Sequence, residues 1–327
     1  MHLRLLGRTS VLAACVFVPT LVPGTPHHSA ADAAPVAANA PAVPPDTHTI
    51  TIRGAKLTYV EAGKGPAVVF VHGSLGEIDD WRAQMEPFAE RYRVIAYSRR
   101  FHPPNAPLKP GGAYAMDEHA EDLAALIRAL HAEPAIVVGH SYGAYISLRM
   151  TLKHPELVRT LVLGEPPILG WLSGTPEADS VGRALFANAL DPARDAFARG
   201  DSVDGLRRFL DGVTGKPGRF DAMPAEMRAE VLRYANEMRG EMTTDRARLM
   251  PAIACESVGR LKMPVLVLSG ETSARFFHIV TEKLHTCLPT ADTATVPNAG
   301  HAMQVANPSF FNEHVLEFLA RKQAAAR

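Results

Sequence analysis

A serine flanked by two glycines is the feature of this sequence most typical of catalysis. The segment GHSYG at residues 139–143 has the form G-x-S-x-G and follows an apolar run at 136–138. Where such a segment joins a buried strand to a helix, the turn is tight and the serine hydroxyl is exposed at the end of the strand. N–H groups at the start of the helix can stabilise a negative oxygen there. The pattern predicts that Ser141 is a nucleophile for acyl transfer.

A serine nucleophile needs a base to take its proton, and His301 is the best candidate among the 14 histidines. It stands in the segment PNAGHAMQ, between the last predicted strand and the last predicted helix. A histidine in a loop after Gly300 is free to swing over Ser141 and accept its proton. His140 and His72 also lie near predicted turns, and we expect them to have structural roles.

The segments that must position these residues alternate between strand and helix patterns. Alternating apolar and polar residues at 47–52 and 56–63 predict a half-buried hairpin. Continuous apolar runs later in the chain predict buried parallel strands, and amphipathic runs between them predict helices. Such an alternation predicts an α/β protein with a mostly parallel sheet covered by helices on both faces. The expected strands are 47–52, 56–63, 66–73, 93–98, 135–140, 158–167, 263–271 and 292–297, and the expected helices are 78–92, 117–131, 141–155, 276–289 and 308–323.

One long region breaks the alternation. Residues 168–260 carry several helical patterns and no clear buried strand. We expect a helical insertion that lies over the carboxyl ends of the strands, where open α/β sheets bind ligands. The sequence thus divides into a first core part at 48–167, this insertion at 168–260 and a second core part at 261–322.

The N-terminal segment indicates export. Two arginines precede a short apolar stretch at 11–22, and small residues follow, so residues 1–33 are expected to be a signal peptide. An uncleaved N-terminal anchor is the alternative. Residues 34–47 form an Ala/Pro-rich linker. The mature protein is expected to be periplasmic or secreted and to have no membrane-spanning segment.

Composition limits the function classes. Lys plus Arg and Asp plus Glu are 34 each, so the formal net charge is zero and nothing favours a nucleic-acid partner. No metal-binding motif is present, and neither metal nor cofactor is expected. In an oxidising compartment Cys255 and Cys287 are as consistent with a disulfide as with two buried thiols.

Three motifs together resemble the α/β-hydrolase family over residues 48–322. They are VHGSLG after the third strand, GHSYGA after the fifth, and NAGHAM near the C-terminus. The resemblance implies that His301 is the base and that the insertion is a cap domain. It also implies an oxyanion hole formed by the backbone N–H groups of Ser74 and Tyr142, in a loop shaped by His72 and Gly73.

The third member of the triad departs from the commonest pattern of this family, an Asp in G-x-x-D after the strand that follows the cap. This chain has GETS there, with Ser273 in place of the Asp. Glu165 is the preferred replacement, because it ends the strand after the nucleophile helix and some family branches carry a Glu at that position. Glu271 is the alternative acid, and Asp292 or no acid at all also stays open.

A serine at the elbow is unlike the Asp of epoxide hydrolases and haloalkane dehalogenases of this fold. An acyl-enzyme implies an ester or lactone substrate, and the apolar cap implies a small or medium apolar one. Leu75, Arg100 and His102 are candidate substrate-binding residues. Arg99 and Arg100 could hold a substrate carboxylate, but structural ion pairs are the stronger interpretation.

Three functions remain open from the sequence. The preferred one is a carboxylic ester hydrolase of the esterase or lactonase kind, using Ser141, His301 and Glu165. A perhydrolase or carbon–carbon bond hydrolase could use the same triad without a cofactor. A ligand receptor of the same fold, without turnover, is the third.

Overall fold

A computed structural model describes residues 47–109, 112 and 114–325. The predicted signal peptide at 1–33 and linker residues 34–46 lie outside the described residues, so both stay predictions. The described part contains no helix that is both long and apolar enough to cross a membrane.

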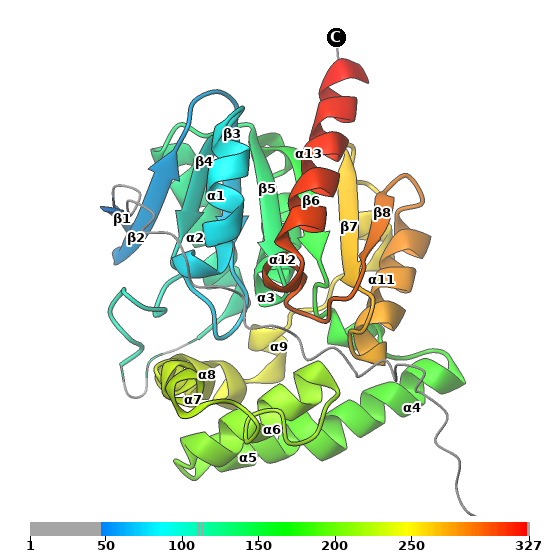
Figure 1. The fold of residues 1–327 in the computed structure, drawn as a ribbon. Coiled ribbons are helices and arrows are strands. Elements are labelled where there is room, and N and C mark those ends of the chain that lie inside the picture. The colour runs from blue at the N-terminus through cyan, green and yellow to red at the C-terminus, as the bar shows by residue number, and fades with distance from the viewer. Residues whose placement is uncertain (1–46, 110–111, 113, 326–327) are drawn as a thin grey trace, which may run out of the picture. The chain divides into compact units, whose positions relative to one another are not determined.

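Eight strands form one sheet in the order β1-β2-β4-β3-β5-β6-β7-β8 (Figure 1). β1 pairs antiparallel with β2 and β2 with β4, while all later pairs are parallel. Every residue of β3, β5 and β7 is buried, as their continuous apolar runs predicted. The strands are β1 Thr47–Ile52, β2 Ala55–Ala62, β3 Ala67–Val71, β4 Arg93–Tyr97, β5 Ala135–His140, β6 Val158–Gly164, β7 Val265–Gly270 and β8 Asp292–Val296.

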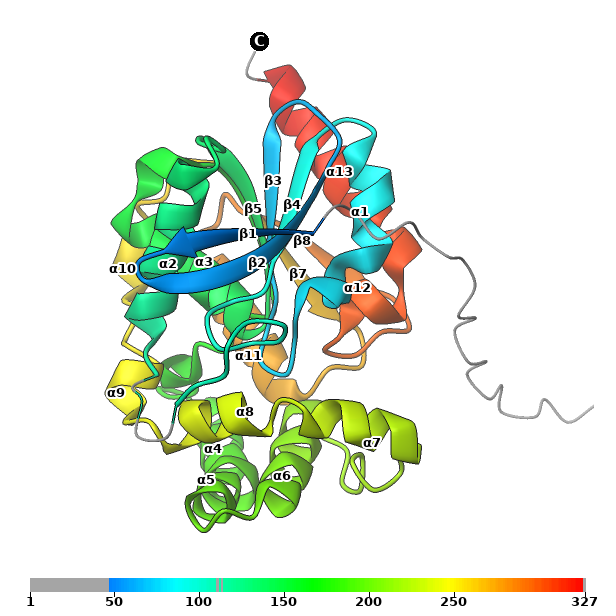
Figure 2. The same ribbon diagram turned by 90° about the vertical axis from the view of Figure 1, so that its left-hand side faces the viewer.

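Helices cover both faces of this sheet (Figures 1 and 2). Apolar side chains of α2, α3 and α11 pack on one face, and those of α1 and α13 pack on the other around Trp81 and Phe70. The α/β-hydrolase architecture expected from the sequence is confirmed. The helices of these two layers are α1 Arg82–Ala89, α2 Met116–Ala129, α3 Tyr142–Lys153, α11 Arg275–Cys287, the short α12 Met303–Ala306 and α13 Pro308–Ala325.

The chain between β6 and β7 contains helices and no strand among its described residues, and we call these helices the cap. α5 to α8 enclose an apolar core of their own, which includes Phe197, Leu206 and Met238. A π-helical turn at Phe186–Leu190 joins α4 to α5. The cap helices are α4 Pro176–Leu185, α5 Asp191–Ala198, α6 Ser202–Thr214, α7 Ala225–Leu232, α8 Ala235–Thr243, α9 Arg246–Leu249 and α10 Cys255–Val258.

Cys255 and Cys287 form a disulfide, which decides the question that the sequence left open. Their Cα atoms lie 5.1 Å apart, and the bond ties α10 at the end of the cap to the end of α11 in the core.

Candidate active site

Ser141 occupies a strained turn between β5 and α3. Its backbone angles are φ 54° and ψ −126°, a conformation that non-glycine residues rarely adopt. The glycines on either side allow this turn. A Cβ at Gly143 would lie 2.2 Å from the carbonyl oxygen of Val71, and one at Gly139 would lie 2.6 Å from Cα of Ala144. The G-x-S-x-G spacing therefore follows from backbone crowding on both sides of the serine.

Two backbone segments meet beside Ser141. Tyr142 is the first residue of α3, so its N–H has no acceptor within the helix. The loop after β3 approaches from the other side, where a Cβ at Gly73 would lie only 2.8 Å from Cβ of Ser141. Ser74, the next residue, lines a cavity together with Ser141 and Tyr142. The structure thus brings both predicted oxyanion residues to the nucleophile candidate.

His301 lies against the carboxylate of Glu165. Nδ1 of His301 is 2.7 Å from Oε2 of Glu165. The other oxygen, Oε1, accepts hydrogen bonds from the Ser269 hydroxyl at 2.9 Å and the Gly270 N–H at 2.8 Å. Phe277 stacks on the imidazole with ring centroids 3.9 Å apart. The orientation of the ring is therefore fixed from two sides.

Glu165 is ionised in this environment although it is fully buried. Burial alone would raise the pKa of its carboxyl group, but the hydrogen bond and charge of His301 and the Gly270 N–H outweigh burial, so the pKa is lowered. Nδ1 of His301 therefore donates to a carboxylate. This arrangement leaves Nε2 as the free acceptor of the imidazole.

Ser141 and His301 both line another cavity, which has a volume of about 430 Å³. The structure contains no hydrogen bond between the Ser141 hydroxyl and the His301 imidazole. Such bonds are often long in a site without substrate and shorten when the reacting complex forms.

The other two acid candidates lie elsewhere. The Glu271 carboxylate is exposed and accepts a hydrogen bond from the N–H of Asn298 at 2.7 Å. Asp292 pairs with Arg321 and Lys322. Neither residue contacts His301, so Glu165 is the carboxylate that the structure brings to the imidazole.

The histidines expected to be structural are buried and neutral. Burial lowers the pKa of His140 to about 3, and its Nε2 lies 2.7 Å from the carbonyl oxygen of His301. Burial and the nearby Arg99 lower the pKa of His72. Nε2 of His72 accepts the N–H of Arg99, so Nδ1 carries the proton donated to the carbonyl of Gly73.

Of the three predicted substrate-binding residues, only Leu75 lines a cavity next to Ser141. The guanidinium of Arg100 instead forms two hydrogen bonds with Asp122, at 2.6 and 2.7 Å. His102 is completely buried, with Nδ1 3.0 Å from the carbonyl oxygen of Gly76. The structural ion pair that the sequence favoured for Arg100 is confirmed, whereas the prediction that His102 binds substrate was wrong, because its side chain holds a loop in place.

Arg99 is also structural, although the sequence made it an alternative substrate ligand. Its fully buried guanidinium donates to the carbonyl oxygens of His72 at 3.0 Å and Gly73 at 2.9 Å. It also donates to the Tyr114 hydroxyl at 3.1 Å. Arg99 therefore fixes the loop that leads to Ser74 from the core side.

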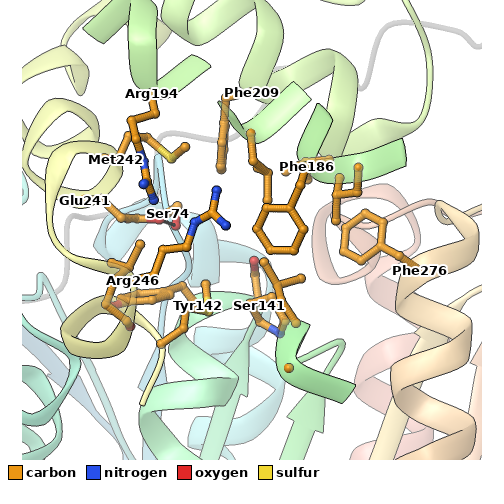
Figure 3. A pocket seen from close by; sticks show the side chains of 18 of the residues that line it. Ser74, Ser141, Tyr142, Phe186, Arg194, Phe209, Glu241, Met242, Arg246 and Phe276 are labelled. Carbon is orange, nitrogen blue, oxygen red and sulfur yellow. Dashed lines mark hydrogen bonds between the residues drawn. The ribbon is translucent and has the colours of Figure 1, made fainter. Parts of the chain in front are cut away.

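A cavity of about 350 Å³ lies between Ser141 and the cap, and we call it the cap cavity (Figure 3). Its walls are mainly apolar, with Phe186, Phe209 and Phe276 among them. The cap adds three charged side chains, Arg194, Glu241 and Arg246, none of which the sequence singled out. They lie on helices without a recognisable motif, and only the folded cap brings them to the site. Within the described residues no cluster of His, Cys, Asp and Glu could hold a metal ion.

Comparison with known proteins agrees with this geometry. Residues 66–308 match the model of the family described as alpha/beta hydrolase fold. The chain belongs to this family. It is 25% identical over 277 residues to the 2-(acetamidomethylene)succinate hydrolase of Mesorhizobium japonicum, covering 80% of this chain and 91% of that relative.

Two further matches do not point to one common substrate. The chain is 32% identical over 126 residues to the uncharacterized hydrolase YraK of Bacillus subtilis, covering 38% of this chain and less than half, 46%, of YraK. Among solved structures it resembles Est816, described as an N-acyl homoserine lactone degrading enzyme, with 25% identity and a TM-score of 0.62 over 83% of this chain and 100% of that one. The chain is thus a hydrolase of the α/β fold.

Proposed function

We propose that this hydrolase cleaves carboxylic esters or lactones through an acyl-enzyme on Ser141, with His301 as base and Glu165 as the acid. The observation that carries the proposal is the 2.7 Å contact between His301 Nδ1 and the buried, ionised Glu165, on the cavity that Ser141 also lines. The strained backbone of Ser141 is a second support, because strain of this kind is maintained where function needs it.

The proposed reaction consists of two half-reactions, and the first forms the acyl-enzyme. His301 Nε2 takes the proton of the Ser141 hydroxyl as its Oγ attacks the carbonyl carbon, and the carboxylate of Glu165 stabilises the imidazolium. The N–H groups of Ser74 and Tyr142 receive the oxyanion of the tetrahedral intermediate. His301 then protonates the leaving alcohol, which in a lactone remains attached to the acyl group.

Water completes the cycle. His301 takes a proton from water, the hydroxide attacks the acyl carbon, and the second tetrahedral intermediate expels Ser141. The carboxylic acid leaves and the hydroxyl of Ser141 is regenerated. Every proton in both half-reactions passes through one imidazole, so its orientation by Glu165 and Phe277 is central to the mechanism.

The substrate class rests on the cavity and one relative. A volume of about 350 Å³ with mainly apolar walls fits a small or medium ester or lactone. The similarity to Est816, whose description names lactone degradation, favours lactones among the substrates to be tried.

Hydrolysis of p-nitrophenyl acetate and butyrate tests the proposal, with Ser141→Ala beside the unchanged chain. We expect turnover that Ser141→Ala abolishes and that Ser180→Ala, an exposed serine on α4, leaves in place. A fluorophosphonate probe should label the unchanged chain at Ser141 and not the Ser141→Ala variant. Equal turnover by Ser141→Ala would exclude the serine mechanism.

We also propose that the protein is exported and works in the periplasm or outside the cell. The disulfide between Cys255 and Cys287 supports this, because such bonds persist in oxidising compartments. The mass of the N-terminal peptide from the mature protein tests it, with cleavage near residue 33 as the expected result. An intact N-terminus in protein recovered from the cytoplasm would contradict export.

A further inference from the structure

Arg194 is a cation on the wall of the cap cavity that pairs with no described carboxylate. It lies on cap helix α5, is half-buried, and lines the same cavity as Ser141. Its Nε donates to the backbone carbonyl of Met242 at 3.1 Å, which fixes the side chain. Within the part of the chain that the structure describes, no carboxylate forms an ion pair with Arg194, and its terminal nitrogens make no hydrogen bond.

The second arginine of the cavity has its charge matched within the fold. Arg246 pairs with Asp191 and lies over the ring of Phe186, with its guanidinium carbon 4.4 Å from the ring centroid. Its position is thus explained by contacts within the cap.

The one carboxylate of the cavity, Glu241, is matched as well. It accepts hydrogen bonds from the hydroxyls of Ser74 at 2.6 Å and Tyr114 at 3.5 Å, and the buried cation of Arg99 lies close by. Glu241 lies close to Arg99, and Arg246 forms an ion pair with Asp191. Arg194 therefore contributes a positive charge that no described side chain of the cavity compensates.

The position of Arg194 indicates where an anion would lie. Figure 3 shows Arg194 entering from the cap side, with Ser141 on the opposite side of the pocket. The Arg246 side chain also extends into this space, and Phe186, Phe209 and Leu249 are among the apolar residues that line the cavity. A ligand that contacts both residues must therefore carry its charge at a distance from the carbonyl that Ser141 attacks.

We propose that the substrate is an ester or lactone with a carboxylate remote from the scissile carbonyl, and that Arg194 binds this carboxylate. The proposal rests on the proposed function. A guanidinium presents parallel N–H groups that match the two oxygens of a carboxylate, and apolar walls strengthen the interaction. One uncompensated cation matches the single charge of a carboxylate better than the higher charge of a phosphate. The proposal adds an anionic end to the small or medium apolar substrate expected from the sequence.

Matched ester pairs test the proposal. Monomethyl adipate is compared with methyl adipamate, in which an amide replaces the carboxylate, and 6-acetoxyhexanoate is compared with 6-acetoxyhexanamide. The first pair places the charge on the acyl group of the ester, and the second pair places it on the alcohol group. We expect kcat/KM to favour the carboxylate in at least one pair by about 10- to 100-fold, the range for hydrogen bonds to a charged group. Arg194→Gln should bring the ratio close to one.

The control is Arg199→Gln directly after the same helix, because Arg199 is exposed and lines neither cavity next to Ser141. It should keep the preference of the unchanged chain. A ratio near one in both pairs for the unchanged chain, with p-nitrophenyl butyrate still hydrolysed, overturns the proposal and leaves the proposed function standing.

A binding measurement that needs no turnover separates the proposed anion site at Arg194 from the proposed function. Calorimetric titration compares hexanoate with hexanamide on the unchanged chain and on Arg194→Gln. Tighter binding of hexanoate that Arg194→Gln removes supports the anion site even if no ester is hydrolysed. Equal binding of the two ligands counts against it. If the unchanged chain neither reacted with the fluorophosphonate probe nor hydrolysed any ester, the result would instead count against the proposed function.

Discussion

The Ser74 hydroxyl donates a hydrogen bond of 2.6 Å to the carboxylate of Glu241, and this contact joins the cap to the proposed oxyanion loop. Glu241 belongs to cap helix α8, whereas Ser74 follows the core strand β3. Arg99 holds the same loop from the core side through the carbonyl of Gly73 at 2.9 Å. The position of the Ser74 N–H thus depends on both layers of the protein, and Glu241 is a positioning residue.

Replacing Glu241 should lower kcat more than it changes KM. Glu241→Ala removes the acceptor of the Ser74 hydroxyl, and a displaced oxyanion donor weakens binding of the transition state but not of the ground state. We expect kcat for p-nitrophenyl butyrate to fall about 10-fold, a fraction of what loss of a whole donor costs. Glu241→Gln keeps an acceptor oxygen and should retain most of the activity.

Glu237→Gln is the matched control, because Glu237 lies one turn earlier on α8 and does not contact Ser74. It should keep the kcat of the unchanged chain. If Glu241→Ala changed KM alone, or if Glu241→Gln were as slow as Glu241→Ala, the positioning role would be incorrect.

Exchange of Glu165 for Gln should cost far more activity than the same exchange at Glu271. The ionised carboxylate of Glu165 holds Nδ1–H of His301 and stabilises the imidazolium, and an amide can do neither well. We expect kcat to fall about 100-fold or more in Glu165→Gln and to change less than about twofold in Glu271→Gln. Steady-state kinetics on p-nitrophenyl butyrate measure both, and similar losses in the two variants would remove Glu165 from the triad.

Local patterns and the family resemblance were sufficient to select Ser141, His301 and Glu165 as triad candidates, because each follows the carboxyl end of a strand in a short, distinctive segment. The crossover rule for parallel strands brings such ends to one edge of the sheet, and the structure places all three there. Strands β3 to β7 were predicted from continuous apolar runs, which are typical of buried parallel strands, and β1 and β2 from the alternation of apolar and polar residues.

Residues whose role depends on tertiary packing were missed or misassigned. Arg194 and Glu241 lie on amphipathic cap helices, and no local pattern reports which side of such a helix faces Ser141. Arg100 was a candidate substrate ligand because it follows β4, although a structural ion pair was the stronger interpretation. The next residue, Phe101, has φ 73°, and in this turn the Arg100 side chain reaches Asp122 on α2. The direction of a loop side chain cannot be inferred from its position in the sequence alone.

Loss of the disulfide should lower the stability of the folded chain. The bond closes a loop with a sequence separation of 32 residues. The chain-entropy estimate for a loop of this length is about 3 to 4 kcal/mol. Chemical unfolding of the Cys255→Ser, Cys287→Ser double variant should show a loss of this order. Reductant should destabilise the unchanged chain and leave the double variant unaffected, and an equal response of both would argue against the bond.

Asp80 should make a contribution to stability that falls as the pH rises from 4 to 7, opposite in sign to that of the buried neutral histidines. Asp80 lies in the turn Ile78–Trp81 against Gly76, and burial, together with the nearby Glu77, raises the pKa of its carboxyl group to about 7. The unfolded chain loses this proton near pH 4, so between pH 4 and 7 the folded state binds more protons than the unfolded state. The contribution of Asp80 to stability then decreases with rising pH and levels off above 7.

Asp80→Asn removes the ionisable group while keeping its size, so it should stabilise the fold most at high pH. We expect a gain of roughly 1 to 3 kcal/mol at pH 8 that shrinks steadily towards pH 4, since each unit of pKa shift corresponds to about 1.4 kcal/mol. Asp79→Asn is the control, because the Asp79 side chain is 64% exposed and pairs with Arg82 at the surface. Urea unfolding of the three proteins at pH 4, 6 and 8 measures the effect. A gain that does not depend on pH, or one that Asp79→Asn reproduces, would show that Asp80 is not the group responsible.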